Sequence, residues 1–297
     1  MTTPLVFAMP GNERLSAELA DHLHYELGHL DTRQFPDGET YLRFADSPEK
    51  RSVAIACTLA HPNEKFLPLI FAAATARELG ALRLGLIAPY LAAYMRQDRR
   101  FTAGEAVTSR QVAHLISEAF DWMVTVDPHL HRYGALGEIY SIPTRVVHAA
   151  PLISQWIKTN IANPLIIGPD SESEQWVTAV AKEAGAPYCV LEKVRHGDRD
   201  VQITIKDIDK WKGRRAVLVD DIISSGRTMI EAVRLLTSRG WTSPVCMAVH
   251  GLFADNSDVL LVEAGACVVT TNSVQHSTNE IDIGQLLADA IGELAVV

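Results

Sequence analysis

Short apolar runs rich in β-branched residues alternate with helix-length amphipathic segments along almost the whole chain. Short apolar runs indicate buried strands, and apolar residues three or four positions apart indicate one face of a helix. Strands that alternate with helices predict parallel sheets covered on both faces, the α/β class. The expected strands are 5–9, 53–57, 82–88, 123–126, 165–168, 188–191, 201–205, 216–219, 245–249 and 267–270. The expected helices are 14–27, 64–79, 109–119, 152–161, 174–184, 229–238, 258–264 and 283–294.

The length of the chain predicts more than one domain. With 297 residues it is long for a single hydrophobic core. The best boundary lies near residues 140–150, after Gly137 and around Pro151, and each half would hold about five strands. The expected parts are a first domain, a second domain and a C-terminal helix able to pack back on the first, at 1–145, 146–283 and 284–297.

Composition argues against a nucleic-acid-binding, membrane-spanning or secreted protein. Hydrophobic residues make up 47% and charged residues 21%, as in soluble globular proteins, and the net charge of −9 argues against binding a nucleic-acid backbone. The longest uncharged apolar stretch, 66–76, is too short to span a bilayer, and the N-terminus lacks the basic region of a signal peptide. We therefore expect a cytoplasmic protein. Its cysteines should be buried reduced thiols, because they sit in β-like runs without C-x-x-C spacing: Cys57, Cys189, Cys246 and Cys267.

The most informative stretch is 217–228. An apolar run ends in two adjacent carboxylates, Asp220 and Asp221, and a short loop of Ser, Gly and Thr leads into a helix-like pattern. Backbone N–H groups of such a loop converge on an anion, and the helix N-terminus adds a favourable dipole. Carboxylates repel a phosphate but accept hydrogen bonds from sugar hydroxyls, so the combination suits a sugar phosphate. The alternative is a pair of solvated aspartates before an ordinary helix.

Basic and polar residues follow several other strands. Arg96, Arg99 and Arg100 fall within five positions after the strand at 82–88, and guanidinium groups suit polyphosphate oxygens. The imidazole of His129 follows the strand at 123–126 and could serve a metal-bound phosphate or be merely structural. The remaining candidates are Asp170, which follows the strand at 165–168, and the cations Lys193 and Arg195, which enter a polar stretch expected to be a mobile loop.

Taken together, these residues resemble the ribose-phosphate diphosphokinase family, also called phosphoribosyl diphosphate synthetase. Seven motifs occur in the family's order over almost the whole chain, and the Arg-Arg-Phe-x-x-Gly-Glu-Ala wording at 99–106 is closer to the short archaeal-type branch. The matching segments are Phe35-Pro36-Asp37-Gly38-Glu39, Arg96-Gln97-Asp98-Arg99-Arg100, Asp127-Pro128-His129, Gly168-Pro169-Asp170, Lys193-Val194-Arg195, the loop from Asp220 to Thr228, and Thr271-Asn272-Ser273.

The resemblance implies an α/β protein of two similar domains with the type I phosphoribosyltransferase-like fold, each a mainly parallel sheet flanked by helices. It implies transfer of the β,γ-diphosphoryl group of ATP to the 1-hydroxyl of ribose 5-phosphate, with Mg²⁺, giving 5-phosphoribosyl 1-diphosphate and AMP. It further implies a homo-oligomer whose active site is shared between subunits. Neither a nucleic acid nor a membrane is expected as a partner.

The resemblance also implies roles for individual residues. ATP would contact Phe35, Asp37 and Glu39 of a neighbouring subunit together with Arg96, Gln97 and Asp98. The metal would lie at His129 and Asp170, and Lys193 and Arg195 would stabilise the transferring group. Ribose 5-phosphate would bind Asp220, Asp221, Ser224, Ser225, Gly226, Arg227 and Thr228.

Three departures from the family pattern leave alternatives open. Pro128 replaces the usual Leu, Arg227 stands where a small residue is common, and the acidic Glu172 and Glu174 stand where small residues are usual. The two glutamates favour a non-catalytic, synthetase-associated regulatory paralogue. An ordinary phosphoribosyltransferase is the third reading, although the arginine loop at 96–100 has no role in that reaction.

Overall fold

The structure is a computed structural model that describes residues 2–92, 94, 97–130, 132–169, 173–195, 201–204 and 208–295. Contacts divide the chain into two compact units, Met1–Val147 with Gly284–Val297 and His148–Ile283. Each unit contains a six-stranded sheet in which all neighbouring strands are parallel. The predicted α/β class with two similar domains is therefore confirmed.

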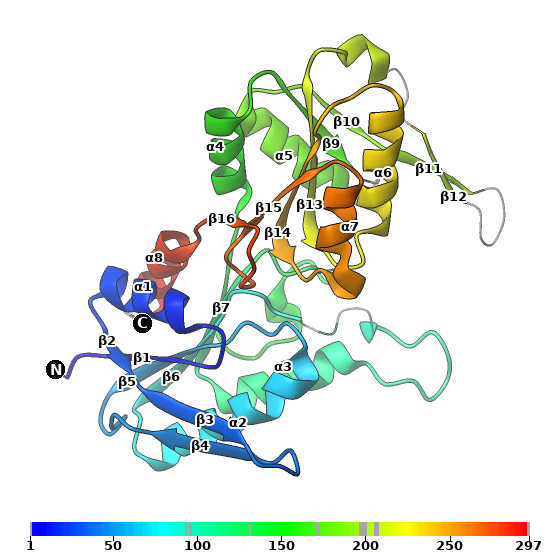
Figure 1. Cartoon of the computed structure of the whole chain (residues 1–297). Helices are drawn as coiled ribbons and strands as arrows, with labels where there is room; N and C mark the ends of the chain where they lie inside the picture. The colour runs from blue at the N-terminus through cyan, green and yellow to red at the C-terminus, as the bar shows by residue number, and fades with distance from the viewer. Residues whose placement is uncertain are drawn as a thin grey trace. The chain divides into compact units, whose positions relative to one another are not determined.

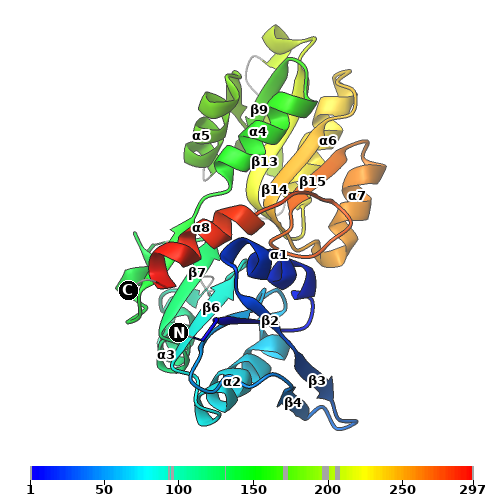
Figure 2. The ribbon, with the colours of Figure 1, turned by 90° about the vertical axis from the view of Figure 1, so that its left-hand side faces the viewer.

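The first unit has its sheet between two pairs of helices, α1 with α8 and α2 with α3 (Figures 1 and 2). Its strands are β1 (Leu5–Ala8), β2 (Glu26–Gly28), β3 (Leu30–Gln34), β4 (Thr40–Phe44), β5 (Ser52–Ala56), β6 (Arg83–Ala88), β7 (Trp122–Val126) and β8 (Thr144–Val147). Its helices are α1 (Glu13–Leu23), α2 (Pro62–Glu78), α3 (Thr108–Ala119) and α8 (Gly284–Ala295), with the short 3₁₀ turn η2 (Leu136–Glu138).

The second unit has α4 and α5 together on one side of its sheet, and α6 and α7 together on the other (Figure 1). Its strands are β9 (Pro164–Gly168), β10 (Tyr188–Val190), β11 (Glu192–Arg195), β12 (Val201–Thr204), β13 (Arg215–Ile223), β14 (Val245–Gly251), β15 (Cys267–Thr271) and β16 (Asn279–Ile281). Its helices are α4 (Ala150–Asn160), α5 (Glu174–Ala184), α6 (Arg227–Ser238) and α7 (Ser257–Glu263), with the 3₁₀ turns η4 (Ile208–Trp211) and η5 (Ala254–Asn256).

The two sheets share one topology. Their strand orders are β2-β1-β5-β6-β7-β8 and β10-β9-β13-β14-β15-β16, so the chain winds outward in both directions from the first strand of each unit. Each unit also inserts a two-stranded antiparallel ribbon, β3–β4 or β11–β12, between the second and third strands of its sheet. The ligand position in such a sheet is the crevice at the carboxyl ends of the strands where the winding direction reverses, beside β1 and β5 or beside β9 and β13.

Buried aliphatic and aromatic side chains fill the space between each sheet and its helices. In the first unit, Phe7 of β1 is fully buried and meets the ring of Phe44 edge-on, with centroids 4.8 Å apart, so the β3–β4 ribbon is anchored on the sheet. In the second unit, Leu218 of β13 and Val233 of α6 belong to one buried cluster. Among the helices described, none combines the length and apolar character that crossing a membrane requires.

The structure corrects three expectations about local structure. Glu26 and Leu27 lie in β2 rather than in the first helix, because His24 ends α1 in the left-handed conformation with φ of 54°. Lys193 and Arg195 lie in the β11–β12 ribbon, opposite Ile203 and Val201, and not in a loop. The strands missed by the apolar pattern are short or polar: β2, β3, β4, β8, β11 and β16.

We expect Gly85→Ala to destabilise the first unit. Gly85 pairs with Trp122 across β6 and β7, and a Cβ atom at Gly85 would overlap the buried indole ring. Overpacking of this kind costs about 1–3 kcal/mol of the free energy of unfolding. Urea denaturation would measure it, with Gly137→Ala as control because no atom lies within 4 Å of a Cβ there. Equal stability of the two variants would contradict the expectation.

Candidate functional site

The carboxyl end of β13 holds the two carboxylates predicted to bind a sugar. The strand continues to Ile223, so Asp220 and Asp221 lie inside it rather than beyond its end at Val219 as expected. Asp220 pairs with Ala248 of β14, and the Asp221 N–H donates to Asp220 Oδ1 at 3.0 Å. Both residues are half-buried. The ladder therefore fixes the backbone that carries them.

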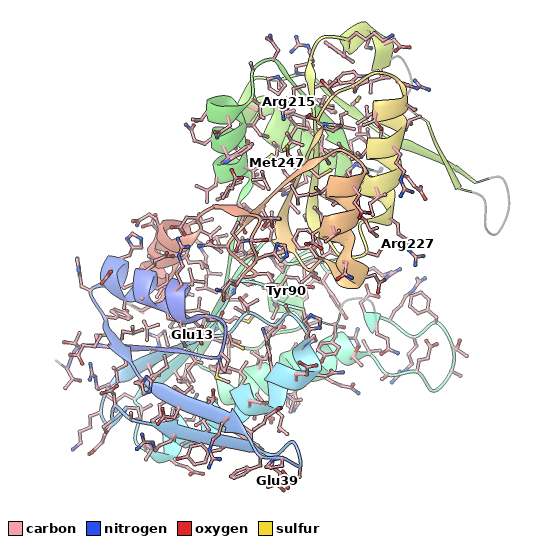
Figure 3. All side chains as sticks on the ribbon, in the orientation of Figure 1. Glu13, Glu39, Tyr90, Arg215, Arg227 and Met247 are labelled. Atoms are coloured by element: carbon pink, nitrogen blue, oxygen red, sulfur yellow. The ribbon has the colours of Figure 1, made fainter. Side chains whose placement is uncertain are left out.

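The loop between β13 and α6 presents backbone donors. Gly226 has φ of 61° and precedes the first residue of α6, Arg227, which is exposed at the start of the helix (Figure 3). Within the described part of the chain, the backbone N–H groups of residues 224–228 have no acceptor. Unpaired N–H groups at a helix N-terminus form an anion site, so this segment suits a phosphate as predicted from the sequence.

The corresponding position in the first unit contains a set of hydrogen bonds around a buried asparagine. There the ends of β1 and β5 are joined by Asn12, a buried side chain whose Nδ2 donates to Met9 O at 3.1 Å. Asn12 Oδ1 accepts the Thr58 N–H at 2.9 Å, and Lys65 Nζ donates to Thr58 O at 2.9 Å. These groups of the first unit therefore bond to one another. The two similar sheets differ in chemistry at the corresponding strand end, because β13 ends with Asp220 and Asp221 before its small-residue loop whereas Cys57 and Thr58 follow β5.

Asp98, predicted to bind ATP, is buried and forms an ion pair with the exposed Arg132. Arg132 Nη1 lies 2.6 Å and 2.7 Å from the two Asp98 carboxylate oxygens, and the Asp98 side chain has no exposed surface. Tyr133 Oη also donates to Asp98 O at 3.2 Å. Asp98 therefore joins the loop after β6 to the loop after β7. Sequence reasoning missed Arg132, although a basic residue three positions after His129 was a usable signal.

An exposed aromatic ring lies between cations in the same region. The Phe101 ring has the guanidinium carbon of Arg99 at 4.5 Å and that of Arg132 at 5.7 Å from its centroid. Glu105 holds the turn, because the Thr102 and Phe101 N–H groups donate to Glu105 Oε2 at 3.0 Å and 2.7 Å and keep the pKa of Glu105 below its ordinary value. An exposed ring flanked by fixed guanidinium groups suits an anionic ligand with a flat base.

The backbone before His129 is held in an unusual conformation. Asp127 is buried and has φ of 33°, and its N–H donates to Val147 O at 3.0 Å. Strained backbone of this kind persists where the surroundings fix it and is frequent at functional sites. His129 is half-buried at the carboxyl end of β7. No group of three or more His, Cys, Asp or Glu side chains able to hold a metal occurs among the residues described.

The segment from Phe35 to Glu39 forms the tip of the β3–β4 ribbon. The Phe35 N–H donates to Glu39 O at 2.8 Å, and Glu39 marks the exposed end of the ribbon (Figure 3). Arg33 stacks between two rings, with its guanidinium carbon 4.7 Å from the centroids of both Phe35 and Tyr41. The ribbon therefore holds an ordered aromatic and acidic tip in solvent.

The other predicted site residues are placed only in part. Gln97 lies within the arginine loop at 96–100 and accepts a hydrogen bond from Thr108 Oγ1 at 3.3 Å. Lys193 and Arg195 have their backbones in β11. The remaining two, Arg96 and Asp170, lie outside the described residues.

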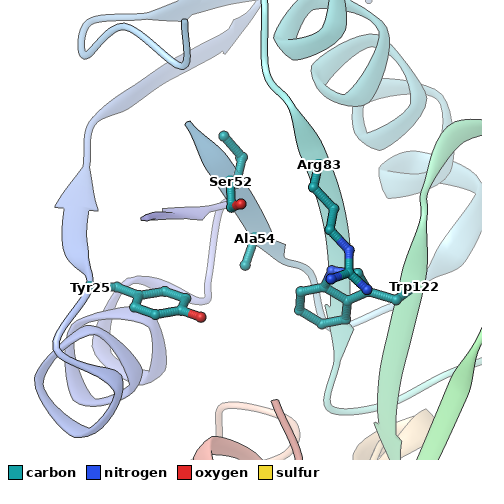
Figure 4. A pocket seen from close by; sticks show the side chains of 6 residues that line it. Tyr25, Ser52, Ala54, Arg83 and Trp122 are labelled. Atoms are coloured by element: carbon teal, nitrogen blue, oxygen red, sulfur yellow. The ribbon is translucent and has the colours of Figure 1, made fainter. Parts of the chain in front are cut away.

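A small pocket in the first unit lies away from these residues. It is lined by the first residues of β5, β6 and β7, Ser52, Arg83 and Trp122, together with Tyr25 (Figure 4). These are the amino ends of the strands, whereas the candidate residues follow carboxyl ends. The two sets of residues therefore lie at opposite edges of the sheet, and the pocket is not part of the candidate site.

Cysteine chemistry does not contribute a nucleophile to the site. All four cysteines are free, and burial raises the pKa of the Cys57 thiol to about 12 and that of Cys189 to about 11. Cys57 and Cys246 are buried, but Cys189 is only half-buried and Cys267 is exposed, which corrects the expectation of four buried thiols. Its position as the first residue of β15 explains the exposure.

Comparison with known proteins shows the family. Residues 5–119 match the N-terminal domain of ribose phosphate pyrophosphokinase, and residues 135–285 match the phosphoribosyl transferase domain. The ribose-phosphate pyrophosphokinase of Methanothermobacter thermautotrophicus is 32% identical over 97% of this chain and 99% of its own, and that of Saccharolobus solfataricus is 34% identical over 92% and 95%. The phosphoribosylpyrophosphate synthetase of Mycobacterium smegmatis has the same fold, with a TM-score of 0.84, 24% identity and coverage of 99% of each chain.

Two archaeal relatives at this level of identity, aligned over nearly their whole length, confirm the resemblance drawn from the seven motifs. The two domain matches follow the order of the two units. The chain belongs to the ribose-phosphate pyrophosphokinase family.

Proposed function

We propose that this protein transfers the β,γ-diphosphoryl group of ATP to the 1-hydroxyl of ribose 5-phosphate. The observation that carries the proposal is the β13–α6 loop, where the N–H groups of residues 224–228 have no acceptor among the described residues and begin three positions after Asp221. The N–H groups would bind the 5-phosphate and the carboxylates would accept hydrogen bonds from the ribose hydroxyls. Family membership supplies the second support.

The reaction needs positioning and charge neutralisation more than a nucleophilic side chain. The sugar 1-hydroxyl oxygen bonds to the β-phosphorus, the bond from that phosphorus to the α,β-bridging oxygen breaks, AMP leaves, and the hydroxyl proton passes to solvent. Cationic groups stabilise the charge on the transferring diphosphoryl oxygens. We assign this role to Lys193 and Arg195, whose β11 backbone belongs to the ribbon inserted beside the second sheet.

ATP would bind to the loops that follow β6 and β7. The flanked ring of Phe101 offers a stacking surface, and Arg96, Arg99 and Gln97 offer donors for the phosphates. Asp98 would act through Arg132 because its carboxylate is engaged in the ion pair with that residue. The residues proposed for the nucleotide belong to the first unit, and those proposed for the sugar phosphate belong to the second.

Mg²⁺ would accompany the triphosphate. It neutralises phosphate charge and is usually held by one or two carboxylates together with substrate oxygens and water. Asp170 has the oxygen chemistry that Mg²⁺ prefers, whereas the His129 imidazole fits a hydrogen bond to phosphate or to metal-bound water better than direct ligation. We therefore propose that Asp170 and His129 both belong to the metal site.

The direct test is product analysis. With ATP, Mg²⁺ and ribose 5-phosphate, the purified protein should form AMP and the sugar 1-diphosphate in equal amounts, as measured by chromatography. EDTA should abolish the reaction. Formation of ADP would mean a simple kinase, and absence of both products would mean the regulatory paralogue. Consumption of the sugar diphosphate with a nucleobase would identify an ordinary phosphoribosyltransferase.

We expect Asp221→Asn to weaken ribose 5-phosphate binding selectively. A hydrogen bond to a charged group contributes about 1.5–3 kcal/mol, so the KM for ribose 5-phosphate should rise at least about tenfold while the KM for ATP changes little. Steady-state kinetics would measure both constants. Asp209→Asn is the matched control, because Asp209 is an exposed carboxylate of the same unit paired with Lys212. An unchanged KM for the sugar would remove Asp221 from the site.

We propose a homo-oligomer in which the tip at Phe35 to Glu39 reaches the nucleotide of a neighbouring subunit. The exposure of this ordered tip supports the proposal. A second support is α2, which packs on β4 and carries the exposed apolar residues Leu67 and Phe71 one turn apart. Leu115 of the adjacent α3 is exposed as well. Apolar side chains exposed together on neighbouring helices are typical of an association surface.

Phe71→Glu should therefore dissociate the oligomer and reduce activity. Phe71 is 44% exposed, so a charge there is compatible with the folded subunit but not with an apolar interface. Sedimentation velocity would measure the mass in solution. Val262→Glu, at a residue of α7 that is 60% exposed, is the control and should leave the mass unchanged. A Phe71→Glu protein with the wild-type mass would exclude the α2 face from the interface.

A further inference from the structure

A buried serine far along the chain holds the back of the phosphate loop. Ser257 is the first residue of α7, has no exposed surface, and donates from Oγ to the Ser224 carbonyl at 2.7 Å. Thirty-three positions separate the two residues. The adjacent Ile223 carbonyl accepts the N–H groups of Leu252 and Phe253, at 2.9 Å and 3.1 Å. Consecutive carbonyls of the loop are thus bonded to the segment that follows β14.

The segment that delivers Ser257 has a strained backbone. Phe253, Asp255 and Asn256 have φ of 47°, 57° and 56°, three non-glycine residues in the left-handed region within four positions. A non-glycine residue in this conformation, and a bulky one above all, destabilises the chain unless the surroundings compensate. Strain concentrated in one turn indicates that the fold requires the residue after the turn to occupy one particular position. Here that residue is Ser257.

Contacts with a neighbouring loop fix the strained turn. The His276 ring contacts the Phe253 ring in a tilted arrangement with centroids 4.4 Å apart, and His276 Nε2 lies 3.5 Å from Asp258 Oδ2. The Thr278 N–H donates to His276 Nδ1 at 3.3 Å. The turn before α7 is therefore held on both sides of Ser257.

The loop leaves little room around Ser257. A Cβ atom at Gly226 would lie 3.0 Å from Ser257 Cβ, so the two small residues pack directly on each other. The Ser257 hydroxyl donates a hydrogen bond to the Ser224 carbonyl of the loop. The N–H groups of residues 224–228 have no acceptor among the described residues. A loop whose carbonyls are fixed can keep its N–H groups oriented before the ligand arrives, which reduces the entropy lost on binding.

We propose that Ser257 is a positioning residue that preorganises the 224–228 loop for the 5-phosphate of the sugar. This role rests on the proposed function, because the ligand of the loop is taken to be ribose 5-phosphate. Ser257 touches the loop backbone and not the substrate. Its removal should therefore change the affinity for the sugar phosphate and leave the affinity for ATP and the chemical step nearly unchanged.

The test compares Ser257→Ala with wild type by calorimetric titration of ribose 5-phosphate and by steady-state kinetics. We expect the Kd and KM for ribose 5-phosphate to rise about fivefold to tenfold, the range set by one lost neutral hydrogen bond. The KM for ATP and kcat should stay within about twofold, since the bond acts only on the phosphate loop. Titration with inorganic phosphate should show a smaller change in the same direction, because it lacks the sugar contacts.

Ser154→Ala is the matched control. Ser154 is buried in the same unit and donates to the carbonyls of Ala150 and Val180, at 2.8 Å and 3.2 Å, between α4 and α5. It should lower the melting temperature without changing the affinity for ribose 5-phosphate. If Ser257→Ala does not fold, Ser257→Cys keeps a donor at this position, although a weaker one on a slightly larger side chain, and should show an intermediate loss of affinity.

The outcomes separate the two proposals. Wild-type affinity in Ser257→Ala, or an equal loss in Ser154→Ala, would overturn the role of Ser257 while leaving the proposed function intact. A wild-type protein that does not bind ribose 5-phosphate would overturn the proposed function itself. Selective loss of sugar affinity in the Ser257 variants alone supports the positioning role.

Discussion

The parallel hydrogen-bonding of each sheet is the constraint on which the candidate site depends. Parallel strands bring all their carboxyl ends to one edge, and the reversal of winding beside the first strand opens a crevice there. In the second unit that crevice lies between β9 and β13, so the acidic residues at the end of β13 and the small-residue loop after them lie beside it. The amino ends of the first unit's strands, by contrast, line only the small pocket at Arg83 and Trp122.

The two units share a topology but use it differently. In the first, Asn12 bonds to Met9 and Thr58 beside the crevice, and a group of cations lies in the loops after β6 and β7. There the exposed Arg132 pairs with the buried Asp98 carboxylate and lies, like Arg99, near the ring of Phe101. In the second, the carbonyls of Ile223 and Ser224 accept hydrogen bonds from the segment that follows β14. The same topology thus carries a cationic and aromatic surface in one unit and an acidic strand end followed by a small-residue loop in the other.

The two inserted ribbons also occupy corresponding places in the two units. Each lies between the second and third strands of its sheet, and each carries residues that the family resemblance connects with ATP or with the transferring group. The tip of β3–β4 is ordered by the stack of Arg33 on Phe35 and Tyr41, although it is exposed. A fixed but solvent-exposed tip is suited to contact another subunit, because little ordering entropy is lost on association.

Local sequence patterns determined the class of fold and the main chemical motif of this protein. Continuous apolar runs identified the central strands, and carboxylates followed by Ser, Gly and Thr identified the loop at 224–228. Both features can be recognised in the sequence because each is encoded within about a dozen consecutive residues. Tertiary structure alone decided the rest. It ended α1 at Leu23, extended β13 through Asp221, and paired Lys193 and Arg195 into a ribbon. It also joined Asp98 to Arg132 and Ser224 to Ser257, more than thirty positions apart. Such pairs are fixed by which elements pack together, and the spacing of residues along one element carries no information about the partner that packing brings to it.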